Sequence, residues 1–206
     1  KLSQDTYDRY TGTAKINVKI TDWAQLNYSN RFIREDLKRP SFLRDDLFHD
    51  LGRQGWPTLP LYDPNGNLYA SPSPALNLRD GGSGIYQTDY LYQQAQVVLE
   101  PIKGWKTFVD FNYRIKNANT HWEIQKTYNH DVEGKPYPYN NNSHVHEDHA
   151  KENYTNFSAY TEYTKSLESG HNFKGMIGFQ SELMKKKVFG LQREGIIIPS
   201  LPEVDL

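Results

Sequence analysis

The residues best suited to chemistry are three imidazoles and a carboxylate that lie close together in the sequence, His144, His146, Glu147 and His149. Imidazole nitrogens and carboxylate oxygens are common metal ligands. A metal site also requires these groups to converge and to have partners that fix their tautomers. The stretch is rich in Asn, where solvated histidines cost little. The sequence therefore favours solvated histidines, keeps His144, His146 and His149 as metal-ligand candidates, and predicts no cofactor.

A second group of oxygen-bearing residues is the segment Asp63-Pro64-Asn65-Gly66-Asn67. Its alternating oxygens resemble the start of a calcium-binding loop, but the distant bidentate Glu of such a loop is missing. Pro followed by Asn-Gly is ordinary turn chemistry. We predict a turn here.

Aromatic residues in the polar stretches form a third group of candidates. Aromatic rings can stack on sugars or hold peptides, and they are enriched at protein interfaces. The alternative is that they pack the loops against each other or against a covering protein. The substrate-contact candidates are Trp56, Tyr62, Trp122 and Tyr137.

No catalytic arrangement is found, and we do not expect an enzyme. The sequence has no nucleophile elbow and no phosphate-binding loop. It has no Cys, which excludes thiolate chemistry. The net charge of −1 gives no basic surface for nucleic acid. Mean hydropathy is −0.82, and no run of apolar residues is long enough for a spanning helix.

Apolar and polar residues alternate along several stretches. From Tyr10 to Ile20 the even positions are apolar or small, and the odd positions between them are polar. Successive strand side chains point to opposite faces, so this pattern predicts a strand with one apolar and one polar face. Phe108 is an exception, an aromatic residue at a polar-face position. The pattern recurs at 24–32, 91–100, 105–116, 157–163 and 173–182.

We interpret these stretches as six strands in three antiparallel hairpins, an all-β, up-and-down segment of a transmembrane β-barrel. Short turns fall at 21–23, 101–104 and 168–171, whereas long polar loops run over 35–84 and 125–151. Short turns at one end and long, extracellular loops at the other are typical of outer-membrane barrels. A half-exposed sheet in a soluble protein would show the same alternation and is the alternative.

Three segments resemble the SusC/RagA-type TonB-dependent transporters of the bacterial outer membrane. Residues 20–23 read ITDW, and residues 99–105 read LEPIKGW, both similar to the family's periplasmic turns. Residues 160–182 are similar to a hairpin in the middle of the family's barrel. Together the segments extend over most of the chain.

The resemblance implies that residues 1–206 are an internal segment of one barrel domain of about 22 strands. It also implies an N-terminal plug and a TonB box, which are expected to precede this segment. The implied partners are TonB, a SusD-type surface lipoprotein that covers the pore, outer-membrane lipid, and an oligosaccharide or peptide substrate.

The expected function is TonB-dependent import of a glycan or peptide fragment across the outer membrane. One alternative is an importer of siderophores or cobalamin. Another, from a different class, is a soluble β-sheet domain that binds glycans or acts as an adhesin. The need for detergent during extraction would separate the barrel from the soluble domain.

Overall fold

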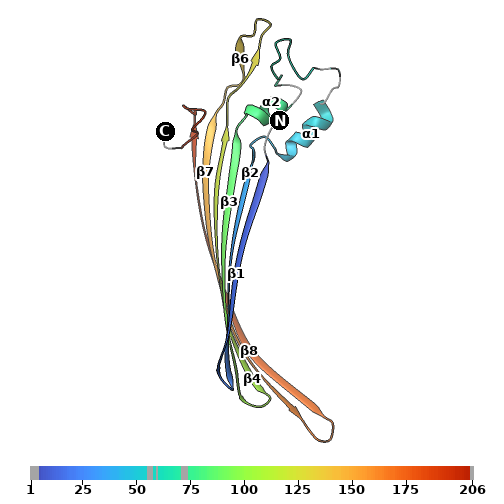
Figure 1. Ribbon diagram of the computed structural model, residues 1–206, viewed down its shortest axis with the longest axis vertical. Coiled ribbons are helices and arrows are strands. Elements are labelled where there is room, and N and C mark those ends of the chain that lie inside the picture. Colours follow the sequence, from blue (N-terminus) through green and yellow to red (C-terminus); the bar gives the residue numbers. More distant parts are fainter. Residues whose placement is uncertain (1–4, 55–57, 59, 71–73, 205–206) are drawn as a thin grey trace.

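A single antiparallel sheet forms most of the molecule (Figure 1). The computed structural model describes residues 5–54, 58, 60–70 and 74–204. The sheet has six strands in the order β1-β2-β3-β4-β7-β8, so strands of this sheet that follow one another along the chain are also neighbours in the sheet. This confirms the all-β, up-and-down prediction. The strands are β1 (Thr6–Thr21), β2 (Ala24–Pro40), β3 (Ser83–Ile102), β4 (Trp105–Ile124), β7 (His144–Ser166) and β8 (Asn172–Glu194).

The strand register separates apolar from polar side chains. Paired residues of antiparallel strands point to the same side of the sheet, so each register row belongs to one face. The even positions of β1 and their partners form the apolar face, and the odd positions form the polar face. One apolar row is Val18, Leu26, Val97, Val109, Ala159 and Phe179. The adjacent polar row is Asn17, Asn27, Gln96, Asp110, Ser158 and Gln180.

Phe108 breaks the alternation on β4 because it has an aromatic partner on the same face. Its ring stacks on that of Tyr160, with centroids 4.7 Å apart and planes 14° apart. The two residues are direct partners between β4 and β7. Offset stacking of a cross-strand pair stabilises a sheet by about 0.5–1.5 kcal/mol.

The strands continue beyond the alternating stretches. The loop predicted at 35–84 begins inside β2, which continues to Pro40, and ends inside β3, which begins at Ser83. The loop predicted at 125–151 begins directly after β4 but ends inside β7, which begins at His144. Polar pairs replace apolar ones there: Arg34 forms a bidentate pair with Asp89 at 2.8 and 2.7 Å. Hydrophobic periodicity cannot reveal a strand that is polar on both faces. The connections are therefore residues 41–82 and 125–143.

These two connections fold together over one end of the sheet (Figure 1). The first contains α1 (Asp45–Gln54) and α2 (Ala75–Asp80), and the second contains the hairpin of β5 (Thr127–His130) and β6 (Pro136–Asn140). The Asn129 side-chain oxygen accepts the Ala70 amide at 2.9 Å, which joins the two connections. A small core lies within the first connection and contains Leu68, Ala70, Ala75 and Leu76.

No helix among the described residues combines the length and the apolar character needed to cross a membrane.

The turn between β3 and β4 depends on a glycine. Gly104 has φ +88°, and a Cβ there would lie 2.5 Å from the Thr164 carbonyl oxygen. Gly170, in the turn between β7 and β8, has φ +87°, but a Cβ added there would meet nothing within 4 Å. A comparison of substitutions at the two glycines therefore separates the cost of backbone strain from the cost of a steric clash.

We expect Gly104→Ala to reduce the free energy of unfolding more than Gly170→Ala does. Both substitutions place a side chain at positive φ, which costs about 1–2 kcal/mol. Only Gly104→Ala adds a clash with backbone, which costs about 1–3 kcal/mol more. Urea unfolding followed by far-UV circular dichroism measures the free energy of unfolding of the two variants. Equal losses would contradict the close approach of Gly104 to β7.

Candidate functional site

The polar face carries connected rows of hydrogen-bonded amides and carboxylates. Asn27 donates to Gln96 at 3.0 Å, and Gln96 donates to Asp110 at 2.7 Å. In the next row Asn112 donates to Asn156 at 3.1 Å, and Asn156 donates to Glu182 at 3.3 Å. Partly buried polar groups are costly unless they are paired, and the hydrogen bonds within these rows pair their side chains with one another. The result is a polar surface.

Cations and tyrosines occupy the same face closer to the loop end. The Arg31 guanidinium lies 5.8 Å from the ring centroid of Tyr92, and Arg114 lies 5.3 Å from that of Tyr154. Arg114 also pairs with the Glu152 carboxylate. These contacts hold planar cations against aromatic rings. The strand sequences alone did not reveal them, because they depend on the register between strands.

A shallow recess lies among these groups. Its volume is about 300 Å³. Guanidinium, hydroxyl and amide groups line it, a donor-rich surface suited to carbonyl, carboxylate or hydroxyl groups of a solute. The polar-face residues around it include Ser29, Arg31, Tyr92, Gln94, Arg114 and Tyr154.

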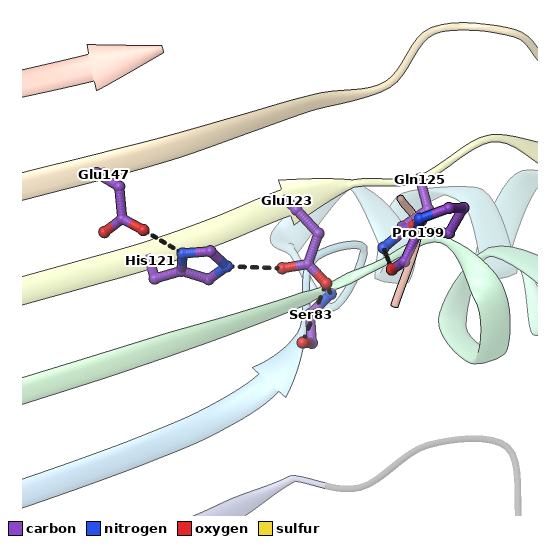
Figure 2. Close-up of polar contacts among 6 residues, drawn as sticks. All are labelled: Ser83, His121, Glu123, Gln125, Glu147 and Pro199. Atoms are coloured by element: carbon purple, nitrogen blue, oxygen red, sulfur yellow. Dashed lines mark hydrogen bonds and ion pairs between the residues drawn. The ribbon is translucent and has the colours of Figure 1, made fainter. Parts of the chain in front are cut away.

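A charged cluster on the other face joins β4 to the start of β3 (Figure 2). His121 lies between two carboxylates, with Nδ1 against Glu147 and Nε2 3.4 Å from Glu123. Glu123 is only 5% exposed and accepts both the amide and the hydroxyl of Ser83, at 2.8 and 3.2 Å. Because Ser83 is the first residue of β3, this carboxylate fixes the point at which the first connection re-enters the sheet.

The segment after β8 folds back onto the same end of the sheet. Gln125 Nε2 donates to the Pro199 carbonyl at 2.7 Å (Figure 2). The Ile196 amide donates to Ser143 Oγ at 3.0 Å, and Arg193 donates to the Val204 carbonyl at 3.2 Å. The hydrogen bonds of Gln125 and Ser143 therefore join the segment to the second connection. We call the two connections together the loop layer.

The three candidate metal ligands lie on two faces of β7. His144 and His146 share the polar face, whereas His149 is an odd number of residues away and lies on the apolar face. His149 is hydrogen-bonded to Asn119 at 2.5 Å. Within the described parts of the chain, no group of three His, Cys, Asp or Glu residues is placed to hold a metal ion.

His144 and His146 pack instead around a substrate-contact candidate, Trp122. The His146 ring stacks on Trp122 at 3.9 Å between centroids, and His144 meets the Trp122 edge at 5.5 Å. Arg44, from the first connection, lies 5.9 Å from the same indole ring. Trp122 is thus half-buried, and its contacts with Arg44 and the two histidines attach the first connection to β4 and β7.

The remaining substrate-contact candidates do not join Trp122. Tyr62 is 51% exposed in the first connection, and Tyr137 is 46% exposed on β6. Tyr139 lies on the same face of β6 as Tyr137 and is also exposed. Trp56 lies outside the described residues. Tyr62 and Tyr137 are free to meet a solute or another protein, and their role in substrate contact stays a prediction.

The segment Asp63–Asn67 forms the predicted turn. The Asp63 carboxylate accepts the amides of Asn65 and Asn67 at 2.9 and 2.7 Å and the Asn67 side chain at 3.0 Å, and Gly66 has φ +86°. Residues 131–135 form a second turn of the same kind, which sequence reasoning missed although Asp131 and Gly134 have the same spacing as Asp63 and Gly66. Asn65 donates across to the Asp131 carbonyl at 3.3 Å, so the two turns abut.

Known structures share this fold. Two structures described as the RagAB peptide importer match it, one in a closed-closed state (TM-score 0.71, 14% identity) and one in an open-open state (0.73, 15%). A structure of the RagAB peptide transporter gives a TM-score of 0.76 at 14% identity. Each match covers 99% of this chain but only 23% of the other.

No protein-family model and no curated sequence matches the chain. At these identities the likeness shows the fold alone: the chain has a partial, barrel-like fold that matches one section of those structures. The chain spans about a quarter of the chains that it matches.

The Asp63 turn should depend on pH. Burial alone would raise the pKa of the Asp63 carboxyl, but the hydrogen bonds from Asn67 and Asn65 outweigh burial and hold the pKa below its ordinary value of 3.8. The stabilisation is therefore complete above pH 3.8 and is lost as the pH falls through the lowered pKa. Amide hydrogen exchange at Asn65 and Asn67 measures this loss.

Asp63→Asn is the matched control, because its side-chain oxygen can still accept the two amides but does not titrate. Its amide protection factors should stay constant over the same pH range. Protection in the unmodified chain that persists well below that range, or an equal loss in Asp63→Asn, would show that the carboxylate does not control the turn.

Proposed function

We propose that this chain forms part of the barrel wall of a TonB-dependent importer in the bacterial outer membrane, which takes up peptide or glycan fragments. The observation that carries the proposal is the two-faced sheet, whose fold matches barrel sections of peptide importers over nearly its whole length. In this proposal the apolar face contacts lipid and the polar face lines the lumen.

The dimensions of the apolar face support a membrane-spanning role. On β4 the apolar face runs from Trp105 to Ile115, about 33 Å at about 3.3 Å per residue. A strand tilted by about 40° would carry this stretch across about 25 Å, the height of the apolar band of outer-membrane barrels. Beyond Ile115 the next residue on this face is Asn117, and its partner on β3 is Asp89.

The sheet edges support closure by further strands. β1 and β8 each have one neighbour among the described strands, so their outer edges carry unpaired amides and carbonyls. Unpaired backbone groups are not tolerated in lipid. In the proposed barrel, further strands pair with both edges.

The connections at the loop end are the proposed sites of contact with substrate and with a SusD-type lipoprotein. They are packed together rather than separately solvated, and they present Tyr62 and Tyr137 outward. TonB would act through a plug region that lies outside this chain. A peptide cargo agrees with what the matched structures are named for, and the donor-rich recess on the polar face suits the carbonyl groups of a peptide and the hydroxyl groups of a glycan alike.

Uptake measurements test the proposal. Cells that express the complete transporter should accumulate labelled peptides or oligosaccharides, and accumulation should stop when TonB is deleted. A complete transporter that carries Tyr62→Ala and Tyr137→Ala should take up less substrate at the same surface abundance. Uptake that continues without TonB, or a protein that is extracted from cells without detergent, would contradict the proposal.

Substitutions on the two faces of β4 test the lipid contact. Val109→Arg should cost about 2–4 kcal/mol, because it places a charge at the centre of the apolar band. Asn112→Arg, on the polar face, should cost only about 1 kcal/mol for the lost hydrogen bond to Asn156. Unfolding of the complete protein in lipid vesicles measures both, and equal costs would rule out a lipid-facing Val109.

Cysteine labelling tests which end faces outward. The sequence has no Cys, so each introduced thiol is unique within it. Val132 is 88% exposed in the turn between β5 and β6. The thiol introduced by Val132→Cys should therefore react, on intact cells, with a maleimide that cannot cross membranes. Ser169→Cys, in the turn between β7 and β8, should react only after lysis. Labelling of Ser169→Cys on intact cells would mean that the orientation is reversed.

A further inference from the structure

Three lysines form a cationic patch on the apolar face of β7 and β8. Lys151 and Lys187 are direct cross-strand partners, and Lys185 is two residues from Lys187 on the same face. All three side chains are exposed. Lys186, between Lys185 and Lys187, points to the polar face instead. We call Lys151, Lys185 and Lys187 the cationic patch.

The cationic patch has no acidic partner among the described residues. Its same-face neighbours across the strands are amides, Asn117 beside Lys151 and Asn153 beside Lys185. By contrast, Arg34 lies in the same register row and forms a bidentate pair with Asp89. Like charges directly opposite each other destabilise a sheet. An anion bound between Lys151 and Lys187 would remove this repulsion.

The position of the cationic patch indicates the kind of anion. On β8 two exposed apolar residues, Phe179 and Leu183, come before the cationic patch on the same face. Lys185 and Lys187 share register rows with Ile115 and Asn117 of β4, where the apolar stretch of that strand ends, whereas on β8 itself Phe189 and Leu191 follow the cationic patch on the same face. In the proposed barrel this is the level at which acyl chains give way to lipid headgroups.

We propose that the cationic patch binds the phosphate groups of a phosphorylated glycolipid headgroup in the outer leaflet of the membrane. This inference depends on the proposed function, because it needs the apolar face to contact lipid. The ammonium groups pair with phosphate oxygens, and the acyl chains of the same lipid lie along Leu183 and Phe179. One ligand thus satisfies the cationic patch and the apolar surface beside it.

The geometry favours a lipid headgroup over free phosphate. Free phosphate is usually held by several backbone amides at a helix N-terminus or in a nest. Here the backbone amides of β7 are engaged in the strand ladder, and those at the outer edge of β8 would pair with the next strand of the proposed barrel, so only side-chain charge is offered. Lysines on flexible stems at a membrane boundary attract anionic lipid by about 1 kcal/mol each. The adjoining apolar surface adds affinity only for a ligand with acyl chains.

Lipid binding to the complete transporter in detergent micelles tests this proposal. The probe is bisphosphorylated lipid A, titrated against the unmodified protein, the double variant Lys185→Gln/Lys187→Gln, and Lys186→Gln as the matched control. We expect the double variant to bind about 30-fold more weakly, because two lysines are lost. Lys186→Gln should bind like the unmodified protein, because its side chain lies on the opposite face.

Two further arms identify the ligand. Dephosphorylated lipid A should bind the unmodified protein as weakly as bisphosphorylated lipid A binds the double variant. Inorganic phosphate at equal concentration should not displace the lipid. Displacement by inorganic phosphate, an equal loss in Lys186→Gln, or unchanged binding in the double variant would overturn the proposal.

The same experiment separates this inference from the proposed function. If the unmodified protein needs detergent and imports its substrate but the double variant binds lipid A normally, the inference alone fails. If the unmodified protein is soluble without detergent, the proposed function fails, and the inference fails with it.

Discussion

The pairing of six long antiparallel strands, with register shifts only close to the turns, is the constraint on which the rest of the structure depends. Because side chains alternate along each strand, the register between neighbours decides which face every residue occupies. A shift by one residue in β4 would move Val109 and Phe111 among the amides and carboxylates of the polar face. The rows of apolar residues and the rows of hydrogen-bonded polar residues therefore depend on the same register.

The loop layer follows from how the strands end. Beyond the apolar band β2, β3, β4 and β7 continue as polar strands, held by pairs such as Arg34–Asp89. Glu123 then fixes the start of β3, and Trp122 holds Arg44 and the adjoining first connection. The layer is thus attached to the sheet through buried and half-buried side chains.

The sequence predicted the all-β class, the three short turns and the faces of the strands, because alternation and turn chemistry are local signals. It placed the loop boundaries at residues 35 and 151 too far inside the strands, since Arg34 to Pro40 and His144 to Lys151 lack alternation of apolar residues. It also grouped His149 with His144 and His146, although a strand places them on opposite faces. Contacts such as that of Arg114 with Tyr154 depend on the register between strands and could not be predicted from the sequence.

The central claim is that the two faces of this sheet meet different solvents, lipid on one side and water on the other. Spin labels placed singly at residues 107–116 of β4, in the complete protein in lipid vesicles, test it most directly. Accessibility to oxygen should peak at odd positions, and accessibility to a water-soluble nickel complex should peak at even positions. Equal access of the nickel complex to both sets would contradict the claim.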